Sequence, residues 1–442
     1  MTSVYCVSKL APTGTSRQHR FSISMVPALL FVAALVSPLV SRMGHGLVLV
    51  WPAYLVWLFF KFNANQKLLW KVKQEIFRRG FTLLMFACWL IFIAVNYLLG
   101  RGYAGQTQIR VIITIGMITF MEITYTVQGG KAWRTLGTII FIFLGLEVIW
   151  SLPTLWSQPM LARDIMESSV YSNLNTQAAL KGVGEYGFYT GCAIAFPFLV
   201  AWALERKRIL RFLLLAVCGA IAIAIVLANF TGAVVLLVTG ICFLGSFALW
   251  KGHKKIRSLI FFIFIGLFAF GTWSLFLKTS TQGEFLINRI SSEVSGVLAR
   301  GLIEGDTTNR AIYWKMSLNT FLDNPLVGVG PVSGQENPFT GTLVGVHSSW
   351  LDALAEYGLI GFGFYVAFLL GSMKRVFMAV KTGQRDLLSL ARLVSCLLFI
   401  IGGTYNPVTF VFSINTFIFL LVMGEIPATA TRPAKKSVPL TT

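Results

Sequence analysis

Charged residues are scarce in this chain of 442 residues, because Asp, Glu, Lys and Arg together make up only 12% of it. In a soluble globular domain, about 25% of the residues are charged. This chain therefore has too few charged residues to form the polar surface of a protein folded in water. Apolar residues make up 56% of the chain. The composition excludes soluble, intrinsically disordered, collagen-like and disulfide-stapled secreted proteins, and it indicates a multi-pass membrane protein.

Metal-binding patterns and internal repeats are also missing from the sequence. The six cysteines lie in the N-terminal tail or in apolar stretches, and none has the spacing of zinc ligands. No repeat of 20 to 50 residues and no pair of inverted halves is visible, which argues against a transporter built from repeats. We therefore expect no metal site and no disulfide framework.

Acidic residues are few, with 17 Asp and Glu against 37 Lys and Arg, which gives a formal net charge of +20. In a membrane protein, such an excess is typical of cytoplasmic loops rich in Lys and Arg. We therefore interpret the charge as a topology signal and expect no nucleic-acid partner.

Long apolar runs predict about twelve membrane-spanning helices. The predicted spans are 22–40, 46–60, 81–99, 109–127, 134–152, 186–204, 209–228, 232–250, 258–277, 358–373, 387–403 and 408–423. The first run is too long for the apolar part of a signal peptide, and we interpret it as a retained anchor. Basic residues gather in alternate connecting segments, beginning with six of them in 61–80. This alternation predicts that both termini face the cytoplasm.

The predicted topology gives an all-α integral membrane bundle with a large helical outer loop. An N-terminal bundle of about nine spans covers 1–277 and includes a smaller outer loop at 153–185. The large outer loop covers 278–357, the C-terminal spans cover 358–423, and a cytoplasmic tail covers 424–442. Three acids, Glu122, Glu147 and Glu185, lie in or beside apolar runs, where acids are usually functional or paired.

The outer loop 278–357 holds the candidate chemistry, because long polar loops between spans usually carry function. Residues 288–294 predict a short surface helix. A second helix begins near Asn309, carries Arg310 and Trp314 on one face, and ends at Asp323-Asn324-Pro325. A third helix begins near His347 and runs into the next span. On this third helix Asp352 and Glu356 share a face; Glu356 either orients a base or forms a salt bridge.

The residues of this loop resemble a known signature. The order Arg310, Trp314, Asn324-Pro325-Leu326, Gly328-Val329-Gly330 and His347 is similar to that of the O-antigen polymerase and O-antigen ligase family. The most specific part is His347-Ser348, nine residues, then Gly358-Leu359-Ile360-Gly361, which resembles the family's His-(Asn/Ser/Gln)-x9-Gly-x-x-Gly pattern. The resemblance in sequence covers about 300–365, and the predicted architecture fits the whole chain.

This resemblance implies an inverting glycosyltransferase at the periplasmic face of the bacterial inner membrane, with no metal and no cofactor. The donor would be a glycan on undecaprenyl diphosphate, and the acceptor a lipid-linked glycan or lipid A–core. Arg310 would grip the diphosphate, and His347 would either deprotonate the acceptor hydroxyl or contact the phosphate. Further candidate substrate-binding residues are Arg289, Arg300, Trp314, Ser348 and Glu356. For Trp314, packing of the loop onto the bundle is the alternative to stacking on a sugar.

Two departures from the family pattern leave questions open. Family members commonly have Ser-Arg near residue 230, where this chain has Asn229-Phe230-Thr231-Gly232, and Ser348 stands where Asn is commoner. Either Arg289 or Arg300 replaces the missing cation, or the donor phosphate is held differently. We favour a polymerase of surface polysaccharide, for which a chain-length regulator is an expected partner. The alternatives are an O-antigen ligase, a protein O-oligosaccharyltransferase and a transporter of lipid-linked sugars.

Overall fold

The regular structure of the described residues is entirely α-helical, as the sequence predicts. The computed structural model describes residues 46–101, 115–116, 119–120, 122–124, 126–127, 130–158, 161–162, 181–184, 186–228, 230–251, 295, 310–331, 344, 347–381 and 387–405. Six helices within these ranges are long and apolar enough to cross a membrane. The predicted spans 22–40, 258–277 and 408–423 lie outside the described residues.

Hydropathy predicted the ends of several helices closely. The helices are α3 (Gly46–Ala64), α4 (Gln66–Arg78), α5 (Gly80–Leu98), α7 (Gly130–Ser157), α10 (Tyr186–Leu204), α11 (Arg208–Leu227), α12 (Thr231–Lys251), α15 (Arg310–Asp323), α16 (Ser349–Lys381) and α17 (Leu387–Tyr405). The ends of α5, α10, α11, α12 and α17 differ from the predicted spans by at most two residues. Helix α4 was not predicted, because its segment was assigned only as a basic loop.

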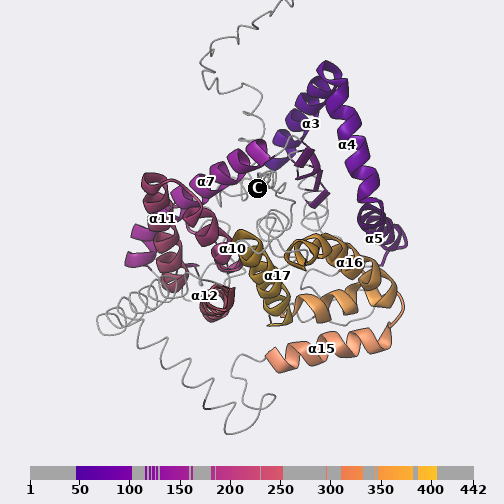
Figure 1. The fold of residues 1–442 in the computed structure, drawn as a ribbon. Helices are drawn as coiled ribbons and strands as arrows, with labels where there is room; N and C mark the ends of the chain where they lie inside the picture. The colour runs from indigo at the N-terminus through magenta and orange to yellow at the C-terminus, as the bar shows by residue number, and fades with distance from the viewer. Residues whose placement is uncertain are drawn as a thin grey trace, which may run out of the picture.

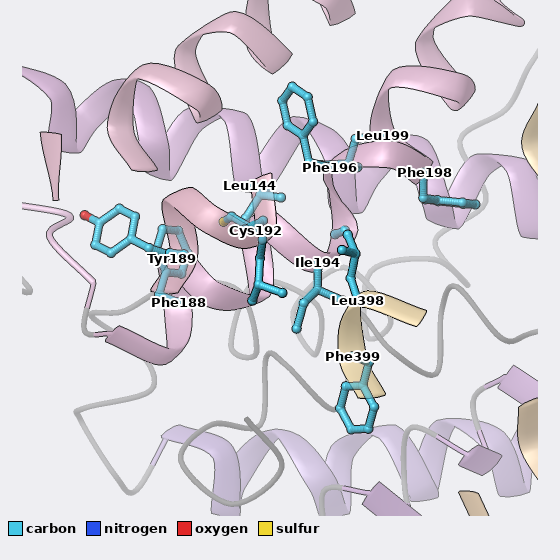
Figure 2. Packing of buried hydrophobic residues seen from close by; sticks show 14 of the residues in the cluster. Leu144, Phe188, Tyr189, Cys192, Ile194, Phe196, Phe198, Leu199, Leu398 and Phe399 are labelled. Atoms are coloured by element: carbon cyan, nitrogen blue, oxygen red, sulfur yellow. The ribbon is translucent and has the colours of Figure 1, made fainter. Parts of the chain in front are cut away.

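Helix α10 forms the centre of the bundle. Every residue from Gly187 to Ala203 is buried, because this helix is apolar on all sides and contacts α11, α12 and α17. Figure 2 shows Cys192 and Ile194 of α10 in the same buried cluster as Leu144 of α7 and Leu398 of α17. A helix enclosed in this way fixes the positions of its neighbours, including α17, against which the candidate site is built.

Helices α15 and α16 carry the motif residues of the predicted outer loop onto the bundle. Helix α16 packs on α5 and α17, and α15 packs on α16. In Figure 1 the salmon helix α15 runs alongside the orange first part of α16, at the edge of the molecule. The predicted second helix of the outer loop is therefore present, and it ends at Asp323 as expected.

The acid Glu122, which the sequence places in the predicted span 109–127, is paired. Both terminal nitrogens of Arg79 donate to the two carboxylate oxygens of Glu122, and the Nε of Arg79 donates to Glu75 Oε1 at 2.5 Å. Burial disfavours the charged form of Arg79, but Glu122 and Glu75 outweigh it and raise its pKa above the usual value. Of the other two flagged acids, Glu147 is half-buried on α7 and Glu185 lies outside the described residues.

Replacing Arg79 with lysine is expected to lower the free energy of unfolding by about 1–3 kcal/mol. Lysine keeps the charge, but its single ammonium cannot bond both carboxylates in the forked geometry of the guanidinium. The measurement is thermal unfolding of the purified protein in detergent. Arg78→Lys is the control, because the side chain of Arg78 is 56% exposed and exposed ion pairs contribute little. Equal melting temperatures for the two variants would contradict the prediction.

Candidate functional site

His347 lies two residues before the start of α16 at Ser349, and its imidazole is stacked on the ring of Tyr313 from α15. The ring centroids are 4.3 Å apart and the ring planes differ by 15°. The indole N–H of Trp314 donates to the carbonyl oxygen of His347 at 3.3 Å. Two consecutive residues of α15 therefore hold the ring and the backbone of His347. The imidazole stays partly accessible, because the residue is half-buried.

Ser348 and Asp352 form the N-terminal cap of α16. Ser348 Oγ accepts from the N–H of Leu351 at 3.4 Å, and the carboxylate of Asp352 accepts from the N–H of Ser348 at 3.1 Å. This reciprocal arrangement satisfies N–H groups that have no partner within the helix. The second carboxylate oxygen of Asp352 accepts from Ser317 Oγ at 2.6 Å. Asp352 thus ties the cap of α16 to α15.

The same first turn of α16 is held on its other side by α17. The indole N–H of Trp350 donates to the carbonyl oxygen of Ile400 at 3.0 Å, and Ser348 Oγ is 3.4 Å from the carbonyl oxygen of Gly403. A Cβ added at Gly403 would lie 2.8 Å from the indole of Trp350, so only glycine allows this close approach. His347 therefore stands on a segment fixed between α15 and α17.

Helix α16 is interrupted at Gly358, where φ is 59° and ψ is −172°. The loop after α15 supplies the hydrogen bonds that the helix loses there. The N–H groups of Val329 and Gly330 donate to the carbonyl oxygens of Ala355 and Glu356 at 3.0 and 2.9 Å. In return, the N–H groups of Leu359 and Ile360 donate to the carbonyl oxygens of Pro325 and Leu326 at 2.8 and 3.1 Å. We call these four hydrogen bonds the backbone seam.

Two motif glycines make the backbone seam possible. A Cβ at Gly328, where φ is 67°, would lie 2.4 Å from the carbonyl oxygen of Glu356, and a Cβ at Gly358 would lie 2.5 Å from the nitrogen of Gly328. Both values are far below any normal contact, so the two main chains can meet only without side chains at these positions. A third motif glycine, Gly361, leaves room for the ring of Phe92 on α5.

The structure brings together part of the predicted set of site residues. His347, Ser348 and Trp314 are in contact, and α15 begins at Arg310, one helical turn before Tyr313. Glu356 is buried further along α16, whereas the carboxylate against the His347-Ser348 segment belongs to Asp352. Arg289 and Arg300 lie outside the described residues.

Sequence reasoning missed two residues, Tyr313 and Asp352. Tyr313 precedes Trp314, which was a candidate residue on α15. Its stacking partner His347 is distant in sequence, so no local sequence pattern indicates the contact. Asp352 was noted only as sharing a helix face with Glu356, although its position four residues after Ser348 allows it to cap the helix.

The position where the family commonly has a cation is occupied here by aromatic packing. Phe230 is buried, and its ring packs edge-on against Tyr186 with centroids 5.0 Å apart, while Tyr189 lies 6.0 Å away. Asn229 lies outside the described residues. Phe230 carries no charge, so it does not supply the cation that the resemblance implies near residue 230.

Replacing Asp352 with asparagine is expected to lower the free energy of unfolding by about 1–3 kcal/mol. An amide keeps the shape of the side chain but cannot accept from Ser348 and Ser317 at the same time, so one buried donor loses its partner. Thermal unfolding in detergent measures the effect. Asp323→Asn is the matched control, because Asp323 is exposed at the end of α15, the helix that Asp352 contacts; equal losses at the two positions would contradict the role of Asp352.

Comparison with known protein families places the site within a recognised domain. Residues 221–366 match the family described as O-antigen ligase. The matched range runs from α11 through α12 and α15 into α16, and so includes His347, Asp352 and both glycines of the backbone seam. No curated protein matches the chain.

Proposed function

We propose that this chain belongs to the O-antigen polymerase and ligase family and transfers a glycan between lipid carriers at the membrane, because residues 221–366 match the family described as O-antigen ligase. The donor is a glycan on undecaprenyl diphosphate, and the acceptor is a hydroxyl group of a second lipid-linked glycan. The product is a longer surface polysaccharide, so the chain acts as a polymerase. The several apolar helices of this multi-pass protein suit carriers with long lipid tails.

The observation that carries the proposal is the stacking of His347 on Tyr313. Tyr313 lies one turn after Arg310 on α15, so the stack brings the backbone of the proposed phosphate-binding arginine close to the proposed catalytic histidine. The two residues are 37 positions apart in sequence. The cap at Ser348 and the backbone seam support the proposal, because they hold this arrangement rigid, as catalysis requires.

The proposed reaction needs one nucleophile, one leaving group and one proton acceptor. The acceptor hydroxyl attacks the anomeric carbon, the bond from that carbon to the diphosphate oxygen breaks, and the diphosphate leaves with the electron pair. Arg310 stabilises the charge that develops on the diphosphate with paired N–H donors. His347 takes the hydroxyl proton as a general base; in the alternative, His347 contacts the phosphate and the diphosphate takes the proton. The family implies inversion without a metal.

The reaction is proposed to take place at the periplasmic face of the bacterial inner membrane, with both termini in the cytoplasm. In support, the helix connection after α10 carries Arg206, Lys207 and Arg208, as expected for a cytoplasmic loop. Ser348, next to His347, reaches Gly403 near the end of α17, which the predicted topology places on the periplasmic side. The proposed catalytic loop 278–357 ends where α16 is interrupted, between the bundle 1–277 and the spans 358–423.

The test is a deletion strain whose lipopolysaccharide is separated on a gel. Loss of a polymerase leaves a single repeat on lipid A–core, and the wild-type chain restores the ladder of longer products. Normal ladders in the deletion strain would contradict the proposal. A direct assay with purified protein, lipid-linked repeats and no added metal or nucleotide should give longer lipid-linked products.

An O-antigen ligase is the second candidate, favoured by the description of the matching family. In that case the acceptor is lipid A–core. The deletion strain would then show bare core, with polymer remaining on the carrier lipid. The two outcomes differ on the same gel, so one experiment distinguishes the candidates.

A further inference from the structure

Helix α4 joins α3 to α5, and its length and charge do not suit a membrane span. It has 13 residues, which gives about 20 Å at 1.5 Å per residue. Four of them, Lys67, Lys71, Lys73 and Arg78, are basic and Glu75 is acidic, so the helix has a net charge of +3 (four minus one). Asn65 caps the helix, because its Oδ1 accepts from the N–H of Leu68 at 3.0 Å.

One face of α4 packs against the protein. Leu68, Val72 and Glu75 are buried, and their spacing places them on one side of a helix. Leu68 and Val72 form a small apolar cluster with Ile123. This face accounts for the attachment of α4 to the rest of the chain.

The opposite face of α4 carries exposed aromatic rings. Trp70 is 62% exposed and Phe77 is 86% exposed, and at 100° per residue both lie roughly opposite the buried face. Phe81, in the first turn of α5, is 65% exposed. Lys67 and Lys71 flank the Trp70 and Phe77 stripe on one side and Lys73 on the other. Packing against the residues that the structure describes does not explain this aromatic stripe, because the rings point away from them.

We propose that α4 is an interfacial helix whose outward face binds the anionic headgroup layer of the bilayer that the protein spans. The rings of Trp70 and Phe77 lie at the boundary between headgroups and acyl chains, which is the usual place for exposed aromatic residues of membrane proteins. Arg78 is paired with Glu75, and Arg79 with Glu122. In this proposal the contacts with lipid phosphates are therefore made by the three lysines. Lysines near an anionic surface strengthen such binding.

The position of α4 in the fold supports this occupant over a soluble partner. Helix α5 starts at Gly80 and is long and apolar enough to cross the membrane, so α4 ends at the edge of a span. In Figure 1, α4 lies along the plane of the picture whereas α5 is seen close to end-on. The chain therefore turns at Arg79, and α4 runs across the end of the span. This inference does not depend on the proposed glycan transfer.

A depth measurement with lipid quenchers tests the proposal. A fluorescent amino acid is introduced at position 70 or 77 of the full chain, in vesicles of phosphatidylethanolamine and phosphatidylglycerol that contain doxyl-labelled lipid. We expect stronger quenching by a label at carbon 5 of the acyl chain than by one at carbon 12. Position 146 is the control, because Leu146 is exposed on the spanning helix α7 and should show the opposite order. Quenching at 146 without quenching at 70 and 77 would mean that protein covers the stripe, and would overturn the proposal.

The second measurement tests the charge. The wild-type protein is expected to melt at a higher temperature in nanodiscs with phosphatidylglycerol than in nanodiscs of phosphatidylcholine alone. The variant with Lys67, Lys71 and Lys73 all changed to glutamine should lose at least half of this difference. A variant with Lys315 of α15 changed to glutamine is the control and should keep the difference. Equal melting temperatures of the wild-type protein in the two lipids would overturn the proposed binding of anionic headgroups.

Discussion

The Gly358→Ala variant is expected to lose about 4 kcal/mol or more of the free energy of unfolding, an unusually large effect for one methyl group. The backbone conformation at Gly358, φ 59° and ψ −172°, is one that essentially only glycine adopts. The added Cβ would also lie 2.5 Å from backbone atoms of Leu326 and Gly328. Because backbone atoms cannot rotate away, the two main chains must separate, and the backbone seam breaks.

Gly363→Ala is the matched control for this prediction. Gly363 lies on the same helix, and a Cβ there meets no atom within 4 Å, so alanine should be neutral or slightly stabilising. The measurement is thermal unfolding in detergent, together with the yield of membrane-inserted protein. Gly328→Ala should behave like Gly358→Ala, because both glycines contribute to the same contact. Similar melting temperatures for the variants at 358 and 363 would rule out the backbone seam as a major source of stability.

The His347→Ala variant is expected to transfer glycan about 10²–10⁴-fold more slowly, which is the usual contribution of a general acid or base. His347→Gln separates the two roles proposed for this residue. Glutamine donates hydrogen bonds but cannot take a proton near pH 7, so it should be as slow as alanine if His347 is the base. Partial activity in the glutamine variant would instead indicate a phosphate contact. The measurement is the rate of product formation with purified lipid-linked substrates.

Tyr313→Phe and Tyr313→Leu are the companion variants. Phenylalanine keeps the ring stacked on the imidazole and should retain most of the activity, whereas leucine removes the stack and should reduce the rate. Both variants should melt within a few degrees of the wild-type protein, since Tyr313 is only half-buried. Normal transfer by a well-folded His347→Ala variant would contradict the assignment of this site.

The helices of the bundle were predictable because burial in lipid or protein demands long apolar runs. The run over 186–204 gives α10 with the same ends, and the basic residues after it mark where the apolar segment stops. Hydropathy carries no information on backbone angles, so the interruption of α16 at Gly358 was not predicted. Helix α4 was missed for a related reason. Its mixture of lysines and aromatic residues resembles a loop in composition, and its buried and exposed faces separate only when the segment is drawn as a helix.

The candidate site was predictable where a local pattern exists. The spacing from His347 to Gly358 and Gly361 was noted as a motif, and the structure supplies its physical reason, since both glycines allow close approach of other groups. Tyr313 and Ser317 were not predictable, because their partners are 34 and 35 positions away in sequence. Arg310 remains a prediction from the motif, supported by the place of its backbone at the start of α15.

The loop over 325–330 is joined to α16 through main-chain atoms alone in the backbone seam. A joint of this kind constrains the course of the chain and does not use the side chains of Pro325 and Leu326, which stay exposed; that of Leu326 is 62% exposed. Substitutions at such outward positions can therefore change the surface of the loop without breaking the hydrogen bonds that hold it. We expect proteins that handle different glycans to vary at these positions while keeping both glycines, so that new specificity arises at little cost in stability.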